Sequence, residues 1–301
     1  MHATPSNATG SARKDQFGEG DSSIKLDALS TELASTAFDR VKAEVDWQAM
    51  KHRTGDVPRR VAVQGEINAD GSMPVYRHPA DESPPLSAFT KTVQEIRQEV
   101  QESLNQPFNH VLIQLYRNGQ DNISEHSDKT LDVVRGSSII NVSLGAQRKM
   151  TLRLKKAAVA SAVMGPAGTA RPSQRIPLPH NSVFVLGPKT NARWLHGVRP
   201  DKRAASERSD VEKAFGGERI SLTFRHIGTW TDAGRTRIWG QGARSKTKEE
   251  AGEVRAADSD EAENMVVAFG RENHKVDFDW EKEYGEGFDA LDLVIVNRPA
   301  G

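Results

Sequence analysis

The sequence has no cysteine, no long apolar run and no excess of either charge. Without cysteine, disulfide bonds, thiolate catalysis, iron–sulfur clusters and cysteine-type zinc sites are excluded. No apolar run approaches the roughly 20 residues that a transmembrane helix needs. The first 22 residues lack the apolar core of a secretory leader. We therefore expect an intracellular protein, cytoplasmic or nuclear, that is not secreted and does not enter a membrane.

The charges balance, with 41 lysine and arginine residues against 41 aspartate and glutamate residues. This balance excludes a strongly basic nucleic-acid coat protein and a protein with an acidic tail, but it leaves room for a local basic groove. Hydrophobic residues make up 36% of the 301 positions, which is enough for one large domain or two small ones. Nothing in the sequence indicates an oligomeric state.

Composition divides the chain into three parts. Residues 1–22 are rich in serine, glycine, alanine and charge, and they bury too little apolar surface to offset the entropy of ordering, so we expect a flexible tail. Residues 23–230 are expected to form the main domain. Residues 231–301 are expected to form a C-terminal extension that packs on the same domain, with a helix at 259–269. Its aromatic residues are Phe278, Trp280, Tyr284 and Phe288.

The hydrophobic spacing of the main domain changes from helical to strand-like. Apolar residues recur every three or four positions in residues 30–47 and 89–104, which predicts two helices, the first with Ser30 as its N-cap. After Pro107 the alternation predicts strands at residues 111–117, 138–144, 149–154, 182–186 and 219–227. Residues 156–175 and 199–218 are expected to be loops. Short strands without helices between them favour a mainly β (α+β) protein, an antiparallel sandwich or barrel with helices covering one sheet.

One His–Asp pair offers metal ligands. Without cysteine, a transition-metal site must use histidine, aspartate and glutamate. His126 and Asp128 are two residues apart, so on an extended segment both point to one face and reach one ion. His196 is the candidate third ligand, and two imidazoles with one carboxylate form the facial triad of non-haem iron oxygenases. The alternative is that His126 and Asp128 lie in a solvated turn.

The strand predicted at residues 219–225 has two chemically different faces. One face carries Arg219, Ser221, Thr223 and Arg225, and the other carries Ile220, Leu222 and Phe224. Arginine binds a carboxylate through two parallel N–H donors, so the polar face suits a barrel interior that holds a dicarboxylate. On the strand at 111–117, Gln114 and Tyr116 share a face and can enter the same cavity. The alternatives are ordinary surface arginines and a half-buried sheet tyrosine.

Five blocks of the sequence together carry a family resemblance. They are residues 109–119 (NHVLIQLYRNG), 126–128 (HSD), 143–148 (SLGAQR), 196–197 (HG) and 219–225 (RISLTFR). In this order they resemble the AlkB-type family of Fe(II)/2-oxoglutarate dioxygenases, over about residues 57–227. The resemblance implies a double-stranded β-helix, or jelly roll. It also implies an oxidoreductase that uses Fe(II), 2-oxoglutarate and O₂.

The resemblance implies roles at the metal centre and around the cosubstrate. His126, Asp128 and His196 would hold the iron, and no catalytic residue is expected beyond this centre. Arg219 would pair with the distal carboxylate of 2-oxoglutarate, and Arg225 would lie near its other end.

Three further residues are expected beside the cosubstrate. Tyr116 would bond to 2-oxoglutarate. Gln114 and Ser221 stand where asparagine is usual in the family: Gln114 keeps the amide, whereas Ser221 has a shorter reach. The resemblance places both residues beside 2-oxoglutarate.

The sequence leaves three classes of function open. AlkB-type enzymes are best known for oxidising N-methyl groups on nucleobases, which requires a flipped base, a phosphate-binding surface and an aromatic ring for stacking. Tyr76 can stack on a base, Arg77 can meet a phosphate and Trp194 can line the cavity, but each can equally be an ordinary loop or packing residue.

The balanced charge and the C-terminal extension favour a small organic substrate such as an amino acid or metabolite. No Lys/Arg cluster resembles a strip for a nucleic-acid backbone. The first alternative is oxidative demethylation of N-alkylated nucleobases in DNA or RNA. The second is a non-catalytic binding protein on the same fold, against which the intact metal and arginine residues argue.

Overall fold

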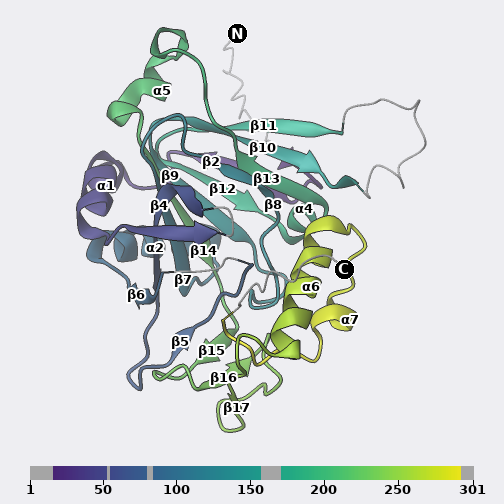
Figure 1. Ribbon diagram of the computed structural model, residues 1–301. Coiled ribbons are helices and arrows are strands. Elements are labelled where there is room, and N and C mark those ends of the chain that lie inside the picture. Colours follow the sequence, from purple (N-terminus) through teal and green to yellow (C-terminus); the bar gives the residue numbers. More distant parts are fainter. Residues whose placement is uncertain (1–15, 53–54, 80–83, 157–170, 293–301) are drawn as a thin grey trace, which may run out of the picture.

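The computed structural model describes residues 16–52, 55–79, 84–156 and 171–292 (Figure 1). Eight consecutive strands form two facing antiparallel sheets. The larger sheet holds, in spatial order, β12 (Ser182–Leu186), β9 (Ile139–Gly145), β14 (Arg219–Arg225) and β7 (His110–Tyr116). The smaller sheet holds β11 (Ser173–Leu178), β10 (Arg148–Leu154), β13 (Trp194–Val198) and β8 (Ile123–His126). This alternation of the chain between two sheets is the double-stranded β-helix, which confirms the expected fold class.

The larger sheet grows to nine strands through flanking segments. On the β12 side lie β2 (Ser22–Leu26) and β1 (Gln16–Phe17), and on the β7 side lie β4 (Gly55–Gly65), β3 (Gln48–His52) and β6 (Leu86–Ala88). Helices α1 (Thr31–Glu44) and α2 (Lys91–Leu104) pack against one face of this sheet (Figure 1). Both helices were predicted, and the side chain of Ser30 caps α1 by accepting the N–H of Leu33.

Apolar and polar side chains alternate along the central strand β14, so its apolar face packs in the main core and its polar face lines the inner cavity. On β14, Ile220, Leu222 and Phe224 are fully buried with the apolar residues of α1 and α2. The opposite face carries Arg219 and Arg225, as the sequence predicts. In the ladder with β7, Arg219 lies opposite Tyr116 and Ser221 lies opposite Gln114, so these side chains are neighbours.

The chain after β14, together with β5, builds a second layer at one end of the β-helix. Strands β5 (Met73–Pro74), β15 (Thr229–Thr231), β16 (Arg237–Gly240) and β17 (Gly252–Glu253) form a small sheet. Helices α6 (Asp260–His274) and α7 (Trp280–Tyr284) follow, with the aromatic residues predicted to pack back on the domain. They share a core with Leu131, which lies three residues after Asp128 in sequence.

The predicted boundary between the tail and the main domain lies too far along the chain. Residues 1–15 lie outside the described part, but residues 16–22 are ordered, so the predicted boundary at residue 22 is wrong. The Phe17 ring packs against Phe184 with centroids 6.2 Å apart, and the Asp21 carboxylate accepts the N–H of Lys189 in α4 (Pro188–Arg193). Composition could not reveal this order because the partners are more than 160 positions away in the sequence.

Two predicted loops also differ from the structure. Of residues 156–175, residues 157–170 lie outside the described part, and β11 already begins at residue 173. The segment 199–218 contains three short helices, η1 (Ala205–Glu207), α5 (Asp210–Lys213) and η2 (Ala214–Gly217). Among the described residues, no helix is long and apolar enough to cross a membrane.

Candidate active site

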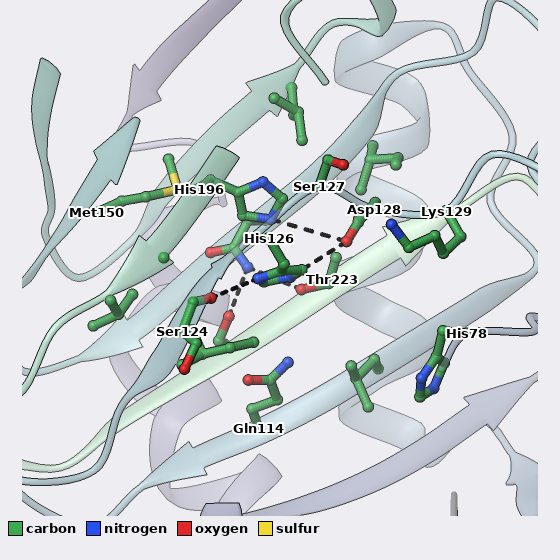
Figure 2. Close-up of a pocket in the computed structure, with 18 of the residues that line it drawn as sticks. His78, Gln114, Ser124, His126, Ser127, Asp128, Lys129, Met150, His196 and Thr223 are labelled. Atoms are coloured by element: carbon green, nitrogen blue, oxygen red, sulfur yellow. Dashed lines mark hydrogen bonds and ion pairs between the residues drawn. The ribbon is translucent and has the colours of Figure 1, made fainter. Parts of the chain in front are cut away.

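The structure brings the three proposed metal ligands together between the two sheets. His126 ends β8, His196 lies opposite it on the neighbouring strand β13, and Asp128 follows two residues after β8. Their ligand atoms all lie within 4.8 Å of one another. The Nε2 atoms of His126 and His196 are 3.6 and 3.9 Å from Oδ1 of Asp128 (Figure 2). Two imidazole nitrogens and one carboxylate oxygen on one side of a common point fit a metal that keeps open positions.

Neighbouring groups orient these ligands. Nδ1 of His126 lies 2.8 Å from the carbonyl oxygen of Ser124, a bond in which the ring N–H donates and Nε2 is left free for a metal. The second carboxylate oxygen of Asp128 accepts from Nη2 of Arg225 at 2.9 Å, in a buried ion pair. The amide of Asn191 accepts the N–H of Asp128 and donates to its carbonyl oxygen.

The local charges favour the protonation states that a cation requires. Burial alone would raise the pKa of Asp128, but Arg225 and the two histidines bring this pKa well below its usual range. Burial, together with the nearby His126, lowers the pKa of His196 to about 3. The pair is therefore an ionised carboxylate beside a neutral imidazole, which are the forms that bind a metal.

Arg219 is an incompletely paired cation in the same cavity. Its Nη2 donates to Asn141 Oδ1 at 2.9 Å and Ser143 Oγ at 2.8 Å, and its guanidinium lies 5.3 Å from the centre of the Tyr116 ring. Nε and Nη1 are buried and have no hydrogen-bond partner in the described part of the chain. Burial lowers the pKa of Arg219 to about 10, so at neutral pH it keeps its charge. Two unpaired donors on one planar cation fit a carboxylate.

Comparison with known protein families identifies the family of this chain. A family model described as the 2OG-Fe(II) oxygenase superfamily matches residues 23–225, about two thirds of the chain. The chain belongs to the 2OG-Fe(II) oxygenase superfamily. The superfamily uses Fe(II), 2-oxoglutarate and O₂, so the expected oxidoreductase class and cofactors are confirmed.

Curated relatives identify this oxygenase as AlkB-type, as the sequence predicted. Two are named "DNA oxidative demethylase ALKBH2": the mouse protein is 33% identical over 46% of this chain and 52% of its own length, and the human protein is 33% identical over 45% and 46%. The bovine "Alpha-ketoglutarate-dependent dioxygenase alkB homolog 3" is 26% identical over 64% of this chain and 62% of its own length. The chain spans about half the length of the ALKBH2 relatives that it matches.

The oxygenase encloses a cavity of about 680 Å³ between the sheets, and the metal-ligand cluster and Arg219 both line it. Gln114, Tyr116 and Ser221 lie on its walls, where the family resemblance places them. The Tyr116 hydroxyl donates to Oε1 of Gln114 at 3.0 Å. Arg225 lies at the other end of β14 from Arg219, against the carboxylate of Asp128.

Two of the three residues predicted to line the substrate space do not do so. Arg77 is 3% exposed and forms a buried ion pair with Asp132, so it cannot meet a phosphate. Trp194 packs in the apolar core between the sheets, and its indole N–H donates to Glu19. Tyr76 does line the cavity, with the Arg225 guanidinium 4.0 Å from its ring centre.

Several residues of the oxygenase site escaped the sequence reasoning. Asn141 lies beside Arg219, and its polar side chain in the middle of an apolar strand was a usable signal. Lys129 and His78 also line the cavity (Figure 2). Helix α6 forms a further part of the wall, with Val266, Phe269, Gly270, Asn273 and His274.

Proposed function

We propose that this oxygenase removes N-alkyl groups oxidatively from nucleobases in nucleic acid, with iron held by His126, Asp128 and His196. One observation carries the proposal: three convergent ligand atoms and a buried, half-paired guanidinium face the same cavity. The iron, when bound with 2-oxoglutarate, supplies O₂-dependent oxidation of a C–H bond with release of succinate and CO₂.

The residues of the chain bind and orient the reactants. Arg219 binds the distal carboxylate of 2-oxoglutarate through its unpaired nitrogens, and Tyr116 and Asn141 hold the guanidinium in place. Arg225 fixes the Asp128 carboxylate and keeps it ionised. Asp128, Arg219 and Arg225 are buried, which strengthens each of these charge interactions.

Two observations support a nucleobase substrate over the small organic molecule that the sequence favoured. The mouse and human relatives are named for DNA oxidative demethylation. In addition, the net charge of zero conceals a locally basic cavity, because its described lining has one carboxylate, Asp128, and four cationic side chains. The cations are Arg59, Lys129, Arg219 and Arg225. A basic cavity attracts both the cosubstrate dianion and a phosphate-bearing substrate.

A small organic substrate is the second candidate, and α6 is the observation that favours it. This helix of the C-terminal extension forms part of the cavity wall beside the metal ligands. A wall at this place narrows the approach of a bulky duplex, so single-stranded or monomeric substrates fit the proposal better than duplex DNA.

The metal assignment is tested by 2-oxoglutarate turnover. We expect succinate formation with Fe(II) and ascorbate in the wild-type protein and none in His126→Ala, because the metal would keep only two protein ligands. His226, which is not among the residues that line the cavity, gives the matched control His226→Ala, which should retain turnover. Turnover that survives His126→Ala would refute the ligand assignment.

The substrate class is tested with a matched panel. N-methylated bases are offered in single-stranded oligonucleotides, in duplexes and as free nucleosides, together with N-methyl amino acids. We expect formaldehyde release, in step with succinate, from the single-stranded oligonucleotides. Release from the amino acids alone would overturn the nucleobase proposal and leave the oxygenase assignment intact.

A further inference from the structure

The segment that carries Asp128 is held by side chains rather than by a sheet. Four successive backbone N–H groups each donate to a side chain from a distant part of the chain. In order, they are Ser127 to Asn273 Oδ1 (3.0 Å), Asp128 to Asn191 Oδ1 (3.0 Å), Lys129 to the Tyr76 hydroxyl (3.1 Å) and Thr130 to Glu272 Oε1 (3.0 Å). Buried backbone groups must be paired, so these four side chains determine where the segment 127–130 lies.

Two of the four accepting side chains, Asn273 and Glu272, lie in the last turn of α6 and are called clamps below. Oδ1 of Asn273 accepts not only the N–H of Ser127 but also its hydroxyl and the Lys129 ammonium, each at 3.4 Å. The Glu272 carboxylate accepts the N–H and the hydroxyl of Thr130. Asn273 and Glu272 therefore hydrogen-bond to the backbone on both sides of Asp128.

Further hydrogen bonds fix the position of Glu272. The Tyr284 hydroxyl of α7 donates to Oε2 of Glu272 at 2.7 Å. Lys155, at the end of β10, donates to the carbonyl oxygen of Glu272 at 2.7 Å. Glu272 is 4% exposed, so its bonds are shielded from competing water. Because both the backbone and the carboxylate of Glu272 are held, Glu272 can fix the position of the segment that it binds.

We propose that α6 completes the metal centre, with Asn273 and Glu272 as positioning residues that place the Asp128 carboxylate toward the two histidines. The proposal rests on the proposed function of His126, Asp128 and His196. It assigns the C-terminal extension a role in building the site, beyond forming a wall of the cavity. Groups that orient metal ligands typically contribute 10- to 100-fold to metal affinity.

The test measures metal binding without turnover, using Co²⁺, whose visible absorption reports the geometry of its ligands. In the full-length protein, Asn273→Leu removes the acceptor at similar side-chain volume, and we expect Co²⁺ affinity to fall about 10-fold with an altered spectrum. Asn273→Asp keeps an acceptor oxygen in the same place and should restore most of the affinity. Arg271→Leu, on the same turn, removes an exposed ion pair with Glu283 and should leave both readouts unchanged.

The outcomes separate this inference from the proposed function. If the wild-type protein binds no Co²⁺, the metal assignment itself fails. If it binds Co²⁺ and a folded Asn273→Leu protein binds it equally well, with the same spectrum, the role of α6 is overturned. Should Asn273→Leu not fold, Asn273→Ala decides by the same titration, with a loss of at least about 3-fold supporting the inference and no loss overturning it.

Discussion

At the scale of single residues, Arg219 is a buried cation with unused hydrogen-bond donors. It is 1% exposed, it lies on the face of Tyr116, and two of its three guanidinium nitrogens have no partner among the described residues. Such a group is costly to bury unless a ligand completes its hydrogen bonds. Arg148 lies 5.7 Å from the same ring, but its Nη atoms already donate to backbone carbonyl oxygens. The two arginines therefore differ in whether they can accept a ligand.

We expect Arg219→Lys to weaken 2-oxoglutarate binding by at least about 10-fold, since lysine cannot form two parallel bonds to a carboxylate. Co²⁺ affinity should be unchanged, because Arg219 does not contact the metal-ligand cluster. Isothermal titration with the metal-loaded protein measures both. Arg148→Lys is the control and should keep 2-oxoglutarate affinity; an equal loss in both variants would contradict a specific role for Arg219.

Arg77 is a charged residue with a structural role in the fold. Its guanidinium pairs with Asp132 and donates to the carbonyl oxygens of Phe288, Ala290 and Gly242, so it joins the C-terminal extension to the β-helix. Sequence reasoning offered phosphate binding or an ordinary loop position, and neither describes a buried structural ion pair. The partner is 55 positions away, and nothing in the local pattern reveals it.

We expect Arg77→Met to lower the free energy of unfolding by about 3–5 kcal/mol, because Asp132 becomes a buried charge without a cation. Urea denaturation measures this loss. The double variant Arg77→Met/Asp132→Leu should recover part of it, since no unpaired carboxylate is left. A stable Arg77→Met protein with weakened oligonucleotide binding would instead support the phosphate role.

At the scale of elements, the strands with strict alternation could be predicted and the irregular ones could not. The five predicted strands are confirmed as β7, β9, β10, β12 and β14, with ends within two residues. Strand β8 (ISEH) is short and polar, and β13 (WLHGV) contains a glycine, so neither has a strand-like pattern. Both carry histidines of the candidate metal centre, which ligand chemistry and the family resemblance pointed to. These histidines therefore lie where the local pattern is weakest, whereas Arg219 lies on the strictly alternating strand β14.

The predicted C-terminal helix illustrates the same limit. It was expected to end at residue 269, before Gly270, but α6 continues to His274. The missed turn holds Glu272 and Asn273, the two residues that grip the Asp128 segment. Glycine disfavours a helix by about 1 kcal/mol, and tertiary bonds at the helix end outweigh this cost. Only the folded arrangement supplies those bonds.

Lys155, which follows β10 and hydrogen-bonds to α6, should make the stability of the protein depend on pH. It is 1% exposed and donates to the carbonyl oxygens of Ala192 and Glu272, and burial lowers its pKa to about 8 from 10.5. Between these values the unfolded chain binds more protons than the folded one. The free energy of unfolding should therefore rise with pH in this window.

We expect the stability of the wild-type protein, relative to Lys155→Met, to increase by up to about 3 kcal/mol from about pH 8 to about pH 10.5. Below about pH 8 the difference should be constant, because the lysine is protonated in both the folded and unfolded states. Urea denaturation of both proteins across the range provides the measurement. A difference that stays flat, or falls as pH rises, would show that Lys155 is not desolvated in the native state.

At the scale of the whole molecule, the C-terminal extension and the metal centre should be energetically coupled. The clamps from α6 reach the Asp128 segment, whereas α1 packs on the far face of the larger sheet and contacts neither (Figure 1). If the contact of α6 with the Asp128 segment favours metal binding, bound metal must by reciprocity favour that contact. Ligand at about 100 times its Kd stabilises the folded state by about 2.7 kcal/mol, and the coupled elements share in this stabilisation.

Hydrogen exchange measured by mass spectrometry tests this coupling. Adding Co²⁺ and 2-oxoglutarate to the wild-type protein should slow exchange in peptides from β8, β13 and α6, because opening of α6 would release the Asp128 segment. Exchange in α1 should change much less. In Asn273→Leu the added protection of α6 should disappear while that of β13 persists, since His196 still binds the metal. Protection confined to β8 and β13 in the wild-type protein would mean that the extension merely covers the site.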